Sequence, residues 1–205
     1  DTVRGRQDRA FFLKHLNEVL ANEQVKDGFT LIGYSMGGAI ATAFAAENPK
    51  RLKQMILLAP AGMGHDLGPV AKATMWPGIG DWLMLALFAR GHRKGTETER
   101  ALPTSVPGIV DYQQAELQRR GFIPAVLSSL RGILSDRLES DHRALEGALP
   151  VLAIWGGIDK TIPLSRRDVL AAWNPTARHA TIDDAGHGLT YTHTSDVMGA
   201  IDHAG

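Results

Sequence analysis

One serine stands in a sequence context that favours nucleophilic chemistry. Ser35 lies at the centre of Gly-Tyr-Ser-Met-Gly, residues 33–37, which has the form G-x-S-x-G. The apolar run 29–32 precedes it and the alanine-rich stretch 38–46 follows it. The pattern therefore predicts a strand, a tight turn and a helix around the serine. The alternative is a glycine-rich turn that only packs tightly or binds a phosphate.

The geometry of such a turn accounts for the other residues of the pentapeptide. A sharp strand-to-helix turn projects the Ser35 hydroxyl above the sheet, with Tyr34 as the preceding residue of the nucleophile elbow. Glycine is expected at positions 33 and 37, because a larger side chain at Gly33 or Gly37 would collide with the adjoining strand or helix. The N–H of Met36, at the positive end of the helix, is placed to stabilise an oxyanion. Because a serine hydroxyl alone is a poor nucleophile, a base must come from elsewhere.

Two later predicted strands end at an acid and at a base. The apolar run 151–155 leads into a loop that contains Asp159, and the run 177–182 leads into a glycine-flanked loop that contains His187. Each residue alone is more typical of a turn or a surface position. Together with Ser35 they give the order Ser, Asp, His, each at a strand end. His187 can then accept the serine proton, while Asp159 fixes the imidazole tautomer.

Two other carboxylates remain alternatives for the acid. Asp183 and Asp184 precede His187 by four and three residues in the same loop. Asp159 is preferred because an acid on a separate loop can approach the far ring nitrogen more freely than a close neighbour in the chain.

Composition argues against several other classes of protein. Lys+Arg and Asp+Glu both number 22, so a nucleic-acid partner is not expected. Cysteine is absent, which excludes disulfides and thiolate chemistry. The histidines lack the paired spacing of zinc sites, and no nucleotide-binding glycine motif occurs, so neither a metal nor another cofactor is expected. The longest strongly apolar stretch, 82–89, is too short to span a bilayer, which predicts a soluble chain with the cytoplasm favoured.

The elements that must position these residues alternate between strand and helix at both ends of the chain. Helices and strands are expected at 9–22, 29–32, 36–47, 54–59, 151–155, 164–173, 177–182 and 195–203. This alternation predicts an α/β fold with a mainly parallel sheet and helices on both faces. Loops at the carboxyl ends of the strands then carry the chemistry.

The middle of the chain has a different pattern. Several helical segments, 79–90, 108–120 and 122–134, follow one another without an intervening strand. We therefore expect a helical cap at 61–149, inserted between the two core segments 1–60 and 150–205. The first of these helices is apolar almost all round, which suits a helix enclosed between the core and other cap helices. The alternative is a helix that rests on a membrane.

Four short segments carry a resemblance to a known family. The sequence resembles the α/β-hydrolase superfamily, in its capped serine branch of esterases, monoacylglycerol lipase-like enzymes and carbon–carbon bond hydrolases. The segments are Gly-Tyr-Ser-Met-Gly-Gly at 33–38, Leu-Leu-Ala-Pro-Ala-Gly at 57–62, Trp-Gly-Gly-Ile-Asp at 155–159 and Ala-Gly-His-Gly at 185–188. The resemblance implies the α/β-hydrolase fold, with Ser35, Asp159 and His187 as a catalytic triad.

The same resemblance implies an amino-terminal truncation. Family members have further strands ahead of the helix at 9–22, one of which leads into a loop that donates the second oxyanion N–H. Without that donor we expect weak activity, since one donor contributes about 3 kcal/mol of transition-state stabilisation. The edge of the strand at 29–32 is expected to be exposed, and either another copy or a missing segment would complete the sheet.

The expected activity is hydrolysis of carboxylic esters or related acyl bonds through an acyl-enzyme. The apolar cap favours a small, partly apolar substrate. Four alternatives stay open: a carbon–carbon bond hydrolase, a cofactor-free haloperoxidase, an acyltransferase, and a non-catalytic protein that binds a ligand in the same pocket.

Overall fold

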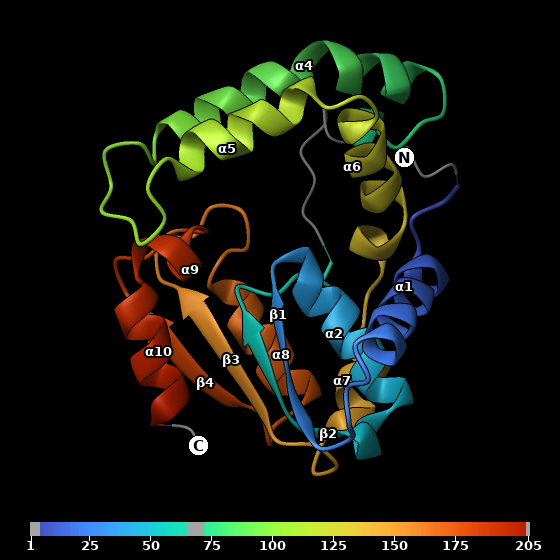
Figure 1. The fold of residues 1–205 in the computed structure, drawn as a ribbon, viewed down its shortest axis with the longest axis vertical. Coiled ribbons are helices and arrows are strands. Elements are labelled where there is room, and N and C mark those ends of the chain that lie inside the picture. The colour runs from blue at the N-terminus through green and yellow to red at the C-terminus, as the bar shows by residue number, and fades with distance from the viewer. Residues whose placement is uncertain (1–4, 65–71, 204–205) are drawn as a thin grey trace.

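The computed structural model describes residues 5–64 and 72–203 of the chain. They form an α/β fold in which a parallel sheet lies between helices and a group of further helices lies above one edge of the sheet (Figure 1). The fold class predicted from the sequence is confirmed.

The sheet contains four parallel strands in the described part of the chain. These are β1 (Phe29–Tyr34), β2 (Leu52–Leu58), β3 (Val151–Gly156) and β4 (Arg178–Ile182). They lie side by side in the order β1-β2-β3-β4, and each neighbouring pair is parallel. Because all four strands run in one direction, the loops after β1, β3 and β4 leave the sheet at the same edge. Each of these loops carries one of the predicted site residues.

Helices cover both faces of the sheet (Figure 1). One face carries α1 (Arg9–Asn22), α2 (Met36–Glu47), α7 (Glu139–Leu145) and α8 (Ser165–Trp173). The other face carries α9 (Leu189–Thr192) and α10 (Thr194–Asp202).

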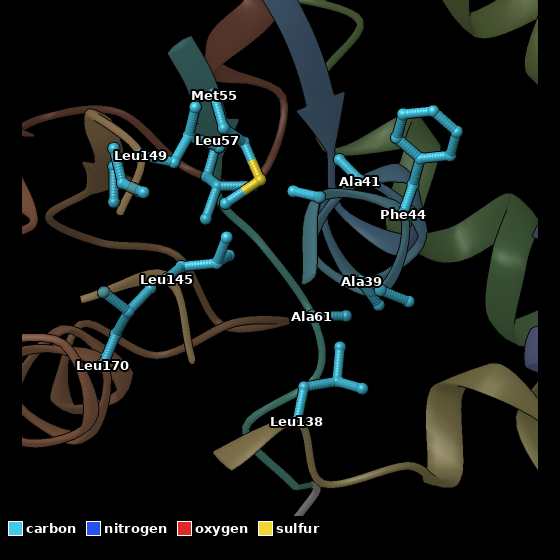
Figure 2. Close-up of a cluster of buried hydrophobic side chains, with 14 of the residues drawn as sticks. Ala39, Ala41, Phe44, Met55, Leu57, Ala61, Leu138, Leu145, Leu149 and Leu170 are labelled. Atoms are coloured by element: carbon cyan, nitrogen blue, oxygen red, sulfur yellow. The ribbon is translucent and has the colours of Figure 1, made fainter. Parts of the chain in front are cut away.

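The larger buried cluster joins the first helical layer to the sheet (Figure 2). Phe44 of α2 and Leu145 of α7 are 0% exposed, as are Met55 and Leu57 of β2. Ala39, also 0% exposed, has a side chain small enough for α2 to lie close to the strands. Burial of each large apolar side chain stabilises the fold by about 1.5–3 kcal/mol. This layer fixes α2, and therefore the turn that precedes it, against the end of β1.

The second face is covered over only part of its width. Ile56 and Ile154 pack against Leu189 and Val197 of the two carboxyl-terminal helices. Ile32 of β1 is 53% exposed, and within the described ranges β1 pairs with β2 alone. The predicted strand at 29–32 is therefore an edge strand, as expected.

In the part of the chain that the structure describes, the upper helical group contains three labelled helices. These are α4 (Ile79–Glu97), α5 (Ile109–Ala115) and α6 (Phe122–Arg131), with α4 in contact with both of the others (Figure 1). In contrast, α7 lies within the predicted cap range 61–149 but packs against α2 and α8 of the core. Within the predicted cap range, the upper helical group therefore extends only to α6. Residues 65–71 of that range lie outside the described part of the chain.

The prediction that the apolar helix near residue 79 is enclosed between the core and other cap helices was wrong. Met84 is buried against the neighbouring helices, whereas Ile79 is 61% exposed and Trp82 is 69% exposed. One face of α4 therefore packs and the opposite face meets solvent. None of the helices described is both long enough and apolar enough to cross a membrane.

His142, on α7, is a titratable side chain enclosed in the core. It is 0% exposed, and its ring lies 6.0 Å from the Trp173 ring, centroid to centroid. Neither ring nitrogen has a hydrogen-bond partner among the residues described. Burial lowers the pKa of this imidazole from 6.5 to about 4, against the opposing effect of the Asp141 carboxylate. The folded chain therefore holds His142 in its neutral form.

The fold should lose stability as the pH falls below 6.5. The pKa of His142 is lowered to about 4 in the folded chain, so between pH 6.5 and 4 the unfolded state binds more protons than the folded state. The contribution of the neutral His142 ring to the free energy of unfolding is complete above the pKa of the unfolded state. This contribution falls by about 2 kcal/mol between pH 7 and pH 5. Urea unfolding at these two pH values measures the loss.

Two histidine variants separate this effect from the titration of other groups. His142→Phe should show about 2 kcal/mol less pH-dependent loss than the unaltered chain. His15→Gln, at an exposed position, should keep the full loss. Equal pH dependence in His142→Phe and the unaltered chain would contradict the assignment.

Candidate active site

Ser35 occupies the turn between β1 and α2 in a strained backbone conformation. Its φ is 51° and its ψ is −118°, in a region that residues other than glycine rarely adopt. Three backbone hydrogen bonds hold it there, each at 2.9 Å: its N–H donates to the Leu58 carbonyl, and its carbonyl accepts from the N–H groups of Gly38 and Ala61. Its side chain forms no capping bond with α2. The hydroxyl is therefore free to face another partner.

The close approach of strand and helix at this turn requires glycine at two positions. A Cβ on Gly33 would collide with the backbone oxygen of Gly37 and would lie 2.8 Å from the Cβ of Ala41. A Cβ on Gly38 would lie 2.6 Å from the Cβ of Pro60. At Gly37 an added Cβ would meet nothing within 4 Å. The steric role predicted for Gly37 is therefore wrong, and Gly38 has that role instead.

Asp159 lies in the loop after β3 and is fully enclosed. Its side chain is 0% exposed. Its Oδ1 accepts hydrogen bonds from the N–H groups of Thr161 at 2.7 Å and Ile162 at 2.9 Å. These two bonds compensate for the loss of water around the buried carboxylate and fix its orientation. The second oxygen, Oδ2, remains for His187.

Two glycines bring the Asp159 loop against the His187 loop. A Cβ on Gly157 would collide with the backbone oxygen of Asp183, and a Cβ on Gly156 would lie 2.6 Å from the carbonyl oxygen of Ala185. The Gly157 N–H also donates to the Ile182 carbonyl at 2.8 Å. Because neither position has space for a side chain, the two loops touch through their backbones.

His187 lies between the serine and the buried aspartate. Its Nδ1 is 2.8 Å from Asp159 Oδ2, and its Nε2 is 2.9 Å from Ser35 Oγ. Its side chain is 22% exposed. With Asp159 as the acceptor at Nδ1, the neutral ring carries its proton there and presents the Nε2 lone pair to the hydroxyl. The three residues predicted from the sequence are therefore brought into one hydrogen-bonded series.

The two alternative carboxylates face elsewhere. The Asp184 side chain is 84% exposed, and its Oδ1 lies 3.4 Å from His193 Nε2. Asp183 contributes its backbone to the contact with Gly157. Of the three candidate acids, Asp159 is the one bonded to the His187 ring.

Met36 begins the 12-residue helix α2, next to the serine. The N–H groups of a first helical turn have no acceptor within their own helix, and the Ser35 side chain does not cap this one. The Met36 N–H is thus suited to receive an anionic oxygen at Ser35, and its oxyanion role stays a prediction. The described ranges contain no group of three or more side chains arranged to hold a metal ion.

Sequence reasoning missed two tyrosine contacts around His187. The Tyr34 hydroxyl donates to the His187 carbonyl at 2.7 Å. The Tyr191 hydroxyl donates to Glu99 Oε2 at 2.6 Å, which connects the His187 loop to the segment after α4. The place of Tyr34 next to Ser35 in the sequence was a signal for the first contact. The bond between Tyr191 and Glu99 joins two positions that no motif in the sequence connects.

Comparison with known proteins places this architecture among hydrolases. The serine aminopeptidase S33 family matches residues 7–194. The 2-hydroxymuconate semialdehyde hydrolase of Pseudomonas putida is 26% identical over 199 residues, which are 92% of this chain and 66% of that protein. The pimeloyl-(acyl-carrier protein) methyl ester esterase of Aeromonas hydrophila is 25% identical over 184 residues, which are 84% of this chain and 68% of that protein.

A solved structure shares the fold along the whole chain. The bromoperoxidase from Bacillus anthracis aligns with a TM-score of 0.82 at 15% identity and covers 100% of this chain and 76% of its own. At that identity the likeness shows the fold alone. The chain spans between 40% and 68% of the length of three related proteins found by sequence.

Proposed function

Because the chain belongs to the α/β-hydrolase superfamily, through its match to the serine aminopeptidase S33 family, we propose that it hydrolyses carboxylic esters through Ser35, His187 and Asp159. The observation that carries the proposal is the series of two short hydrogen bonds, at 2.9 Å and 2.8 Å, that links the three side chains. The similarity to a methyl ester esterase supports an ester as the substrate.

The first half of the reaction forms an acyl-enzyme. His187 Nε2 accepts the proton of Ser35 Oγ while Oγ bonds to the carbonyl carbon of the ester. The carbonyl oxygen becomes an oxyanion, which the Met36 N–H stabilises. As the tetrahedral intermediate collapses, the carbon–oxygen bond to the alcohol breaks, and the alcohol leaves with the proton from His187. Throughout, Asp159 stabilises the imidazolium.

The second half repeats these steps with water. His187 accepts a proton from a water molecule, whose oxygen attacks the acyl carbon, and then returns that proton to Ser35 Oγ as the carboxylic acid leaves. Met36 is the one oxyanion donor assigned among the residues described. Since each donor changes kcat by about 10²–10³, we expect modest turnover from this donor alone.

A fluorophosphonate probe tests the proposal directly. The probe phosphonylates an activated serine, so we expect one adduct, located on Ser35 by mass spectrometry of peptides. His187→Ala and Asp159→Ala should each suppress the labelling. Release of p-nitrophenol from p-nitrophenyl acetate and from p-nitrophenyl esters with longer acyl chains then measures turnover. Absence of any adduct on folded protein would overturn the proposal.

Hydrolysis of a carbon–carbon bond is the second candidate. It is favoured by the similarity to 2-hydroxymuconate semialdehyde hydrolase, whose named substrate contains no ester. The same three side chains could serve this reaction. Incubation with 2-hydroxymuconate semialdehyde and with an ester of similar size, followed by product analysis, separates the two candidates.

A further inference from the structure

Tyr34 connects the turn that carries the nucleophile to the loop that carries the base. Its hydroxyl donates to the backbone carbonyl of His187 at 2.7 Å, across 153 positions in the sequence. Its ring also packs on the imidazole, with 5.3 Å between the centroids and 32° between the planes. Tyr34 immediately precedes Ser35, so the two groups that must exchange a proton are linked a second time, through the backbone.

The hydrogen bonds of the His187 loop lie on either side of the histidine. The Ala185 N–H donates to Ile182, the Ala185 carbonyl accepts from Ile158, and the Gly188 carbonyl accepts from Tyr191. A Cβ on Gly188 would also collide with the Tyr191 ring, whereas a Cβ on Gly186 would meet nothing within 4 Å. Among the residues described, the donor to the carbonyl of His187 itself is the Tyr34 hydroxyl.

The Tyr34 phenol keeps its proton at any ordinary pH. Burial raises the pKa of this hydroxyl well above its usual value of 10, and the negative charges of Glu99 and Asp159 raise it further. The hydroxyl therefore remains a hydrogen-bond donor over the whole range in which a hydrolase of this kind works. Ionisation of the Tyr34 hydroxyl therefore does not break its hydrogen bond to the His187 carbonyl in that pH range.

We propose that Tyr34 is a positioning residue, whose hydroxyl sets the distance between His187 Nε2 and Ser35 Oγ by holding the His187 carbonyl. This inference rests on the proposed function. The effect of the bond is geometric: a misplacement of about 1 Å between reacting groups can lower a rate by about 10². The Ser35–His187 separation is 2.9 Å, within the range for proton transfer, so there is little tolerance for drift of the loop.

Tyr34→Phe tests the proposal because it removes only the hydroxyl. We expect kcat for ester hydrolysis to fall by about tenfold to a hundredfold with KM unchanged within twofold. The control is Tyr112→Phe, the same chemical change at a side chain that is 65% exposed, and it should leave both kcat and KM unchanged.

A spectroscopic readout separates failure of this inference from failure of the proposed function. The Nδ1 proton of His187, shared with Asp159, should give a downfield proton resonance in the unaltered chain, and Tyr34→Phe should broaden or lose it. The thermal unfolding midpoint of Tyr34→Phe, compared with that of the unaltered chain, shows whether the variant is folded and covers the case in which phenylalanine impairs folding.

Each outcome has one meaning. Wild-type kinetics and an unchanged resonance in Tyr34→Phe would overturn the positioning role while leaving the proposed function intact. An unaltered chain that shows the resonance but neither hydrolyses esters nor binds the probe would overturn the proposed function, and the resonance in Tyr34→Phe would still decide whether Tyr34 holds His187.

Discussion

Ser35→Ala should lower kcat for ester hydrolysis to near the uncatalysed rate, a loss of up to about 10⁶. In the proposed reaction the Ser35 Oγ bonds to the acyl carbon, and neither the Met36 N–H nor His187 can replace it. A smaller loss is expected if turnover is already modest, because the variant cannot fall below the background reaction. Initial rates with p-nitrophenyl acetate, together with the fluorophosphonate adduct, measure the effect.

Ser165→Ala is the matched control. Ser165 also begins a helix, α8, but it is exposed, and it belongs to the stretch after β3 and not to the loops after β1 and β4. Its rate and labelling should equal those of the unaltered chain. If Ser35→Ala kept more than a tenth of the rate, the nucleophile would have to be another residue.

Asp159→Asn should lower kcat by about 10⁴ at neutral pH, equivalent to about 5 kcal/mol of activation free energy. The carboxylate has two separate tasks here: Oδ1 accepts from the N–H groups of Thr161 and Ile162, and Oδ2 bonds to His187 Nδ1. The asparagine carbonyl can keep the first task, so its amide N–H₂ must face the ring. Nδ1 then has to accept, the ring proton moves to Nε2, and that nitrogen can no longer take the proton of Ser35.

The two alternative acids supply the controls for this prediction. Asp183→Asn and Asp184→Asn make the same chemical change in the loop of His187, and each should alter kcat by less than about threefold, since neither carboxylate is bonded to that ring. Unfolding midpoints confirm that each variant is folded. A loss with Asp184→Asn as large as that with Asp159→Asn would reassign the acid.

The meeting of Ser35, Asp159 and His187 could be predicted because it depends on features that a sequence displays. Strands of a parallel sheet are short apolar runs, and their carboxyl ends share one edge, so three polar residues placed after three such runs must gather there. The sequence predicts a helix at 36–47 after the serine, and α2 has those bounds, because alanines favour helix from residue 39 onward and Asn48-Pro49 ends it.

Other features depend on how backbones meet, which residue types alone do not reveal. Gly37 and Gly38 are the same residue type, yet only at Gly38 would an added Cβ collide with Pro60. Helix α7 was not separated from the cap because its short polar sequence gives little helical periodicity, and only its contacts with α2 and α8 assign it to the core. The bond from Tyr191 to Glu99 joins two loops whose approach is set by the packing of the entire upper helical group.

The strand order has a consequence for how this protein can change over evolutionary time. Strands β2 and β3 are hydrogen-bonded neighbours, yet residues 59–150 lie between them in the chain. Closing such an excursion costs chain entropy that grows only with the logarithm of its length, so that doubling the excursion adds about 0.6 kcal/mol. A change in the length of the upper helical group therefore alters this entropy little, whereas α7, which packs on the core, must keep its place. The molecule combines a segment whose length can vary with three side chains whose spacing cannot.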